Sequence, residues 1–111
     1  MYRGTTPTLP IRIAGVDLTQ AKLFLTIQDG KNETKQITLE TPTDFTVTYD
    51  SIKDVTEGDV TLTQEQTMML NEGSCRAQIR FVFADGQAGT TLIRTLSVND
   101  VLLKDVISYD G

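Results

Sequence analysis

Four carboxylates within ten residues form the cluster of the sequence that most resembles a metal-binding loop. They are Asp50, Asp54, Glu57 and Asp59. Oxygen-rich loops bind Ca²⁺, but the EF-hand type needs acidic or amide side chains at alternate positions before a glycine, which this spacing does not provide. A glycosidase pair needs one carboxyl in apolar surroundings that raise its pKa, and no Asp or Glu here has such neighbours. We interpret the cluster as a solvated charged loop and predict no metal site.

The sequence also lacks the combinations of side chains that nucleophilic catalysis requires. The sequence has no histidine, which excludes Ser-His-Asp and Cys-His arrangements and the common zinc patterns. The single cysteine, Cys75, alternates with Ala77 and Ile79 on the apolar face of a predicted strand, so we expect a buried thiol. Gly86 and Gly89 are not followed by the Lys-Ser/Thr pair of a phosphate-binding loop. The sequence therefore predicts a protein that is not an enzyme and binds no cofactor.

The composition indicates one acidic β domain. A chain of 111 residues usually forms a single domain, and its 18 threonines favour strands. A net charge of −5 with scattered Lys and Arg disfavours nucleic acid. No apolar segment approaches the roughly 20 residues that span a bilayer, and no apolar leader opens the chain. We therefore expect partners that are proteins, with no nucleic acid and no membrane.

Alternation of apolar and polar residues predicts about seven strands. These fall at residues 8–13, 21–28, 34–40, 45–49, 60–62, 75–83 and 90–98, with an irregular acidic segment over 50–59. Pro10 cannot donate to a ladder, so the first strand is expected at a sheet edge. In the last strand, Leu92, Leu96 and Val98 are expected to share one face. This pattern predicts an all-β fold, an antiparallel immunoglobulin-like β-sandwich over residues 9–98.

One short helix is predicted near 64–70, before the longest strand. Thr63 and Gln66 fit a capping box, in which each side chain accepts a hydrogen bond from the other residue's backbone amide. Two interpretations are open for the apolar run Met68, Met69 and Leu70: it contacts a partner protein, or it covers the end of the core. We expect Met68 and Leu70 to close the end of the core, and Met69, which points the other way, to be free for a partner.

Two segments lie outside the predicted sandwich: an N-terminal arm, residues 1–8, and a C-terminal tail, residues 99–111. In the tail, apolar residues recur at helical spacing, which predicts a short amphipathic helix. That element either folds back on its own domain or docks on a neighbouring subunit. We predict partner contacts in both segments and on the helix, at Tyr2, Arg3, Met69, Leu102, Leu103, Val106 and Ile107.

Several segments together resemble a known group of proteins. They are Tyr2–Thr8, Leu23–Gln28 before Asp29–Gly30, Leu62–Thr67 before Gly73, the strand around Gln78–Arg80, Asp85–Gly86 and the Thr-rich last strand. The sequence resembles small proteins encoded among the structural genes of tailed bacteriophages and prophages. It is also similar to the immunoglobulin-like N-terminal domain of phage upper baseplate proteins, which attaches receptor-binding machinery to the tail.

The resemblance implies a structural protein of the virion, assembled in the bacterial host. Because no receptor-binding region follows the predicted sandwich, we expect an adaptor or accessory subunit of the tail, neck or baseplate. Its partners would be other phage structural proteins, and copies of the chain would form an oligomer or ring. A capsid decoration protein and a small protein-binding module outside the virion remain alternatives.

Overall fold

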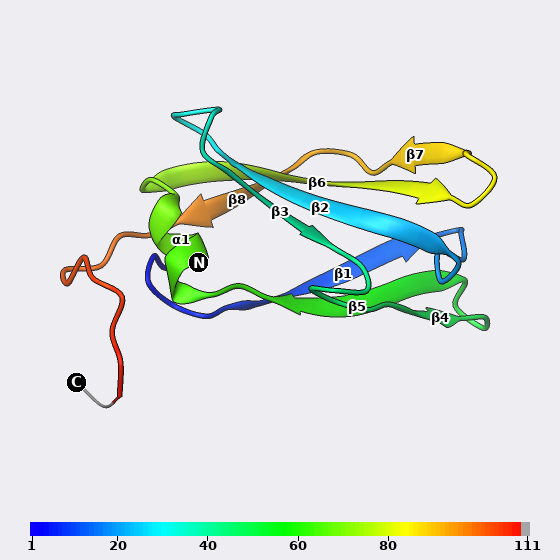
Figure 1. Cartoon of the computed structure of the whole chain (residues 1–111), viewed down its shortest axis with the longest axis horizontal. Coiled ribbons are helices and arrows are strands. Elements are labelled where there is room, and N and C mark those ends of the chain that lie inside the picture. Colours follow the sequence, from blue (N-terminus) through cyan, green and yellow to red (C-terminus); the bar gives the residue numbers. More distant parts are fainter. Residues whose placement is uncertain (110–111) are drawn as a thin grey trace.

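The computed structural model describes residues 1–109, and it confirms an all-β, antiparallel immunoglobulin-like sandwich with one short helix (Figure 1). The elements follow in the order β1 (Thr8–Ala14), β2 (Ala21–Asp29), β3 (Gln36–Glu40), β4 (Thr48–Asp50), β5 (Val55–Thr61), α1 (Gln64–Met69), β6 (Gly73–Phe83), β7 (Ala88–Thr90) and β8 (Arg94–Val98). The two C-terminal residues of the predicted tail, 110 and 111, lie outside the described residues.

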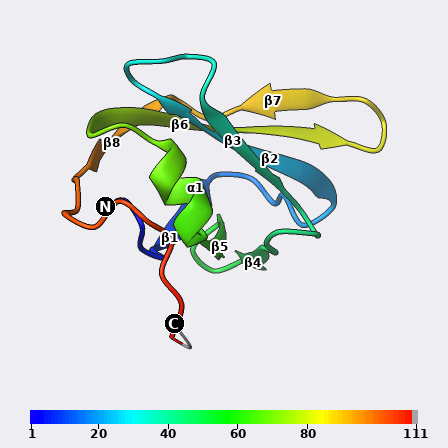
Figure 2. The same ribbon diagram turned by 60° about the vertical axis from the view of Figure 1, so that its left-hand side comes forward.

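Two antiparallel sheets form the layers of the sandwich. The first has the order β1-β5-β4, and the second has the order β3-β2-β6. Both β7 and β8 pair with β6 in succession and extend the second sheet. Figure 2 shows α1 placed across one end of the two layers. One long side of the sandwich is therefore bordered by β1 in one layer and by β7 and β8 in the other.

The core lies between the sheets and is closed at one end by α1. On β2, Leu23, Leu25 and Ile27 are all buried, as the alternation of that segment predicts. The capping box of Thr63 and Gln66 is present at the start of α1. At its other end Leu70 is fully buried and Met69 is 45% exposed, as expected. Met68, predicted to help close the core, is instead only partly buried and lies against Gly4 of the N-terminal arm.

A buried carboxylate connects the end of α1 to the β2–β3 turn. Asp29 is inaccessible to solvent and accepts four hydrogen bonds, from the backbone amides of Lys31, Asn32 and Asn71 and from the Asn71 side chain, at 2.7–3.0 Å. Burial alone would raise the pKa of Asp29, but these hydrogen bonds outweigh it and hold the pKa below its usual value. Asp29, part of an Asp-Gly pair typical of a simple hairpin turn, thus holds both the β2–β3 turn and the connection between α1 and β6.

The acidic segment contains a strand that the sequence analysis missed. Residues 50–59 were predicted to be irregular, with a strand at 60–62, yet β5 runs from Val55 to Thr61 and pairs with β1 over seven residues. Glu57 and Asp59 alternate with Gly58 and Val60, so the charges lie on the outer face and the period of two is preserved. The acidic composition concealed this alternation.

The predicted strand over 90–98 is divided in two. Thr90 lies opposite Arg80 and Arg94 lies opposite Ala77, so β6 advances three residues while its partner advances four. One extra residue moves the following side chains to the other face of the sheet. Leu92 is therefore 87% exposed, whereas Val98 is buried, and the prediction that they share one face is wrong.

Two further elements differ from the prediction. The strand expected at 45–49 is confined to Thr48–Asp50, and Phe45 is buried in the connection before it. The amphipathic helix expected in the tail is absent, since residues 101–109 take neither helical nor strand structure. An isolated helix of this length lacks the packing that would stabilise it in water.

Candidate docking groove

The outer edge of β1 is unpaired in the described structure. Leu62 N donates to Pro7 O before β1, and Gly15 N donates to Asp54 O after it. Because hydrogen-bonded pairs in an antiparallel ladder recur at every second residue, the backbone groups of residues 9, 11 and 13 face β5. Those of residues 8, 10, 12 and 14 face the open side. Pro10, which has no N–H, lies on that open side, as expected of a proline in an edge strand.

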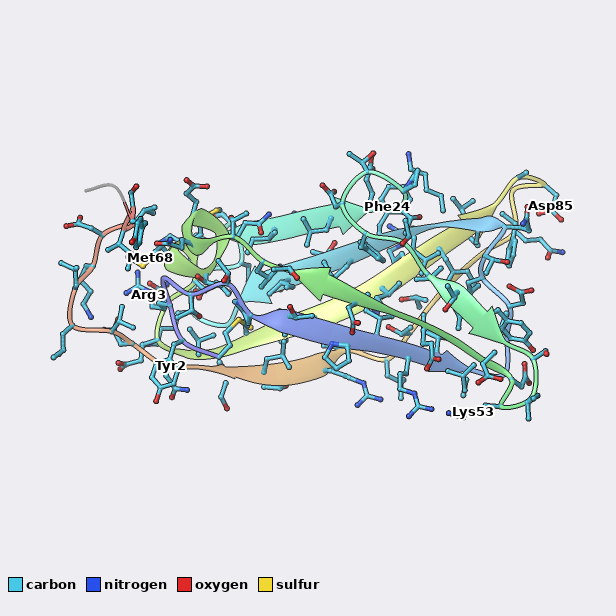
Figure 3. The ribbon with its side chains drawn as sticks, turned by 90° about the horizontal axis from the view of Figure 1, so that it is seen from below. Tyr2, Arg3, Phe24, Lys53, Met68 and Asp85 are labelled. Atoms are coloured by element: carbon cyan, nitrogen blue, oxygen red, sulfur yellow. The ribbon has the colours of Figure 1, made fainter. Side chains whose placement is uncertain are left out.

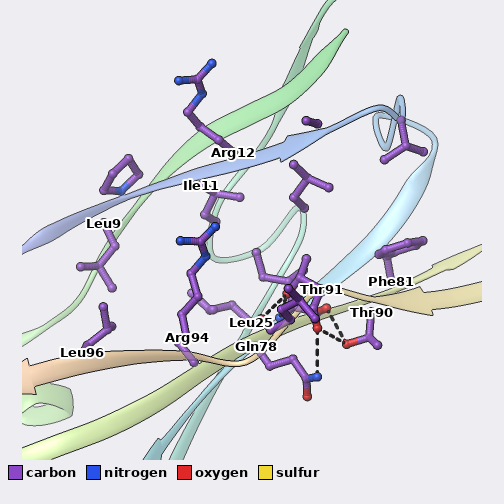
Figure 4. A pocket seen from close by; sticks show the side chains of 17 residues that line it. Leu9, Ile11, Arg12, Leu25, Gln78, Phe81, Thr90, Thr91, Arg94 and Leu96 are labelled. Atoms are coloured by element: carbon purple, nitrogen blue, oxygen red, sulfur yellow. Dashed lines mark hydrogen bonds between the residues drawn. The ribbon is translucent and has the colours of Figure 1, made fainter.

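A groove of about 710 Å³ lies between this edge and the edge of the second sheet (Figure 4). Its lining is mainly apolar, from β1 on one side and from β2, β6 and β8 on the other. The principal apolar side chains are Leu9, Ile11, Ile13, Leu25, Ile79, Phe81 and Leu96. Ile11, Leu25 and Ile79 are buried at its base. We refer to this feature as the docking groove.

One charged side chain crosses the docking groove. Figure 4 shows Arg94 extending from β8 towards Ile11 on β1. Arg12 also lines the groove. Its Nε lies 3.8 Å from Oε2 of Glu57, and its charge is at the exposed rim. Within residues 1–109, Arg94 has neither a salt bridge nor a hydrogen bond from its side chain. The groove therefore combines an apolar base with an arginine available to an acidic group.

The N-terminal arm covers one end of the open side. The Met1 amino group donates to Ser97 O, Asn99 N donates to Met1 O, and Arg3 N donates to Asn99 O. A parallel bridge joins Tyr2 to Asn99. The arm thus lies along the end of β8 before the chain crosses to β1, and the docking groove extends from there along the rest of β1.

Arg3 fastens this arm to the start of the tail. Its guanidinium lies 2.9 Å from an Asp100 oxygen and donates to Met68 O on α1. Hydrogen bonds from Lys104, Val101 and Arg3 lower the pKa of Asp100 to about 2. Figure 3 shows Tyr2, Arg3 and Met68 at one end of the molecule, and Lys53 and Asp85 at the other. We refer to the contacts of Arg3 with Asp100 and Met68 as the clasp. The clasp holds the start of the tail at the α1 end of the molecule.

Beyond Asp100 the apolar side chains of the tail are exposed. Leu102 is fully exposed, and Leu103, Val106 and Ile107 are between 49% and 61% exposed. The Ile107 backbone exchanges two hydrogen bonds with the Gln64 side chain of α1, both at the exposed surface. The tail contacts the helix but does not bury its large side chains there.

The predicted contact residues divide into two kinds. Tyr2 and Met69 are about half exposed, and the four tail residues are exposed, so all six can reach a partner. Arg3 is different, because its side chain is 19% exposed and is bound to Asp100 and Met68. Its position in the clasp does not fit the predicted docking role. The groove itself, with Arg94 in it, was not predicted.

Comparison with known proteins gives a likeness in fold. No protein-family model matches the chain, and no curated protein matches it. Among solved structures, it is similar to AggA, the major subunit of aggregative adherence fimbriae type I from Escherichia coli. The TM-score is 0.49 at 12% sequence identity, covering 88% of this chain and 84% of that one.

The acidic segment is used for local turns. Asp50 accepts from the amides of Ile52 and Lys53, and Asp54 accepts a hydrogen bond from the Tyr49 hydroxyl. In the described part of the chain, no three acidic or cysteine side chains come together as a metal site.

No helix among residues 1–109 is long and apolar enough to cross a membrane. Cys75 is buried as expected, and burial raises the pKa of its thiol.

Proposed function

We propose that this protein is a non-enzymatic structural subunit that receives an extended segment of another chain in its docking groove. The observation that carries the proposal is the apolar groove beside the unpaired edge of β1. An extended peptide can add to such an edge through backbone hydrogen bonds while its alternate side chains enter the groove. Thr8, Arg12 and Ala14 would supply the outward amides on the β1 side.

A ligand-binding role fits the groove less well. Small-molecule sites usually combine an enclosed apolar cavity with a few converging polar groups. This groove is long, lies between two strand edges and contains Arg94, whose side chain has no ion pair or hydrogen bond among residues 1–109. Unpaired strand edges are also the feature that proteins otherwise cover or blunt to prevent association. The partner best matched to the groove is a polypeptide.

We place this subunit in the virion of a tailed phage, as an adaptor or accessory protein of the tail, neck or baseplate. The support for that setting is the resemblance of the sequence to phage structural proteins. A capsid decoration protein would use the same groove on a shell lattice, and a binding module outside the virion would use it on a host protein.

Quantitative peptide mass spectrometry of purified phage particles from the source strain tests this setting. We expect about six copies or a small multiple per particle, since tail and neck parts follow ring symmetry. Hundreds of copies would indicate the capsid decoration protein. Absence of the chain from the particles would contradict the virion role and favour the module outside it.

A further inference from the structure

We propose that the strand received by the docking groove is the tail of a second copy of this chain, residues 101–109. The inference rests on the proposed function and specifies the partner. The tail of the donating copy would lie in an extended conformation in the groove of the receiving copy, between β1 and β8 of that receiving copy. Each copy then carries both halves of the contact, the groove and the tail.

The apolar surface of the tail supports this assignment. Half of the large hydrophobic side chains that are exposed in residues 1–109 belong to it, namely Leu102, Leu103, Val106, Ile107 and Tyr109. A concentration of exposed apolar residues marks an interaction site. The groove presents the complementary apolar lining on the same chain.

The charges of the tail and groove are also complementary. In an extended tail, Leu103, Asp105 and Ile107 lie on one face. Arg94 extends into the groove near Ile11 and, among the described residues, neither Arg94 nor Asp105 has a side-chain ion pair or hydrogen bond. An Asp105 carboxylate beside Arg94 would satisfy both charges.

The spacing of the side chains agrees with that pairing. Successive residues on one face of a strand are about 7 Å apart. With Asp105 beside Arg94, Leu103 and Ile107 fall one such step to either side. On β1, Leu9 and Ile13 flank Ile11 by the same step and line the groove. Nine extended residues span about 30 Å, which is sufficient for the whole of β1.

The tail is directed away from the groove of its own chain. Asn99 and Asp100 are held by the arm through Met1 and Arg3, so the chain cannot reverse directly after β8. The tail leaves at the α1 end, whereas β1, which lines the groove, runs away from that end (Figure 1). A tail therefore reaches the groove of a neighbour. Such head-to-tail contacts produce a ring or a filament.

Sedimentation equilibrium of the full chain and its charge variants tests the proposal. We expect the average mass of the full chain to rise with concentration, and Arg94→Glu or Asp105→Arg alone to weaken association about tenfold or more. An equal mixture of the two variants should associate again, because each groove then meets a tail of opposite charge. Arg80→Glu and Asp59→Arg, exposed and outside the groove, are the matched controls.

A truncation after Asp100 provides the second measurement. It keeps the Arg3 clasp, so we expect an unchanged melting temperature and a monomer at every concentration. A full chain that stays monomeric, a truncated chain that still associates, or a mixture that stays dissociated would each overturn the inference. If the truncated chain also enters phage particles while Arg94→Glu does not, another protein supplies the strand and the proposed function stands.

Discussion

Replacing Asp29 by alanine is expected to lower the free energy of unfolding by roughly 3–5 kcal/mol, since each buried donor left without an acceptor costs about 1–3 kcal/mol. The Asp29 carboxylate accepts four hydrogen bonds, three of them from backbone amides that have no other acceptor in these turns. A loss of that size is a large part of the stability of a small domain. Urea unfolding, followed by circular dichroism, measures it.

Asp59→Ala is the matched control for this substitution. Asp59 is an exposed aspartate on β5 without a side-chain hydrogen bond or ion pair in the described structure, so we expect a change within about 0.5 kcal/mol. Equal effects of the two substitutions would contradict the structural role of Asp29.

The same carboxylate predicts a pH dependence of stability. Its pKa in the folded chain lies below the ordinary value of 3.8. The contribution of Asp29 is therefore fully present above that value and is lost as the pH falls through the lowered folded pKa. Asp29→Ala should remove this part of the acid sensitivity.

Leu70→Ala is expected to cost roughly 2–5 kcal/mol, the range for a large aliphatic side chain truncated in a packed core. Leu70 is fully buried and closes the core at the α1 end, while its neighbour Met69 is 45% exposed. Met69→Ala should therefore change stability by less than about 1 kcal/mol. Thermal unfolding of both variants gives the comparison. A larger loss for Met69→Ala would mean that the end of the core is closed differently.

The sequence was sufficient for the fold class because its strongest strands alternate cleanly. Leu23, Leu25 and Ile27 on β2, and Cys75 and Ile79 on β6, are buried as their spacing predicts. The role of Pro10 at an unpaired edge also followed from its missing N–H. These features depend on local chemistry, which a single sequence contains.

The missed features depend on which strands become neighbours. The alternation of β5 was hidden by its acidic residues, and it became recognisable only beside β1. The extra residue between β7 and β8 is visible only against the register of β6. The docking groove requires both sheets, because Leu9 and Arg94 come from opposite ends of the chain. The helical spacing in the tail was misleading, since an unpacked segment of this length does not form a helix.

Hydrogen exchange with mass spectrometry tests most directly whether the docking groove receives a strand. The chain in its associated form, with its own copies or in the phage particle, is compared with the dilute free chain. We predict new protection of the amides at Arg12 and Ala14 on the outer edge of β1, with the edges of β3 and β4 unchanged. Protection at β3 or β4, with β1 still exchanging freely, would contradict this account.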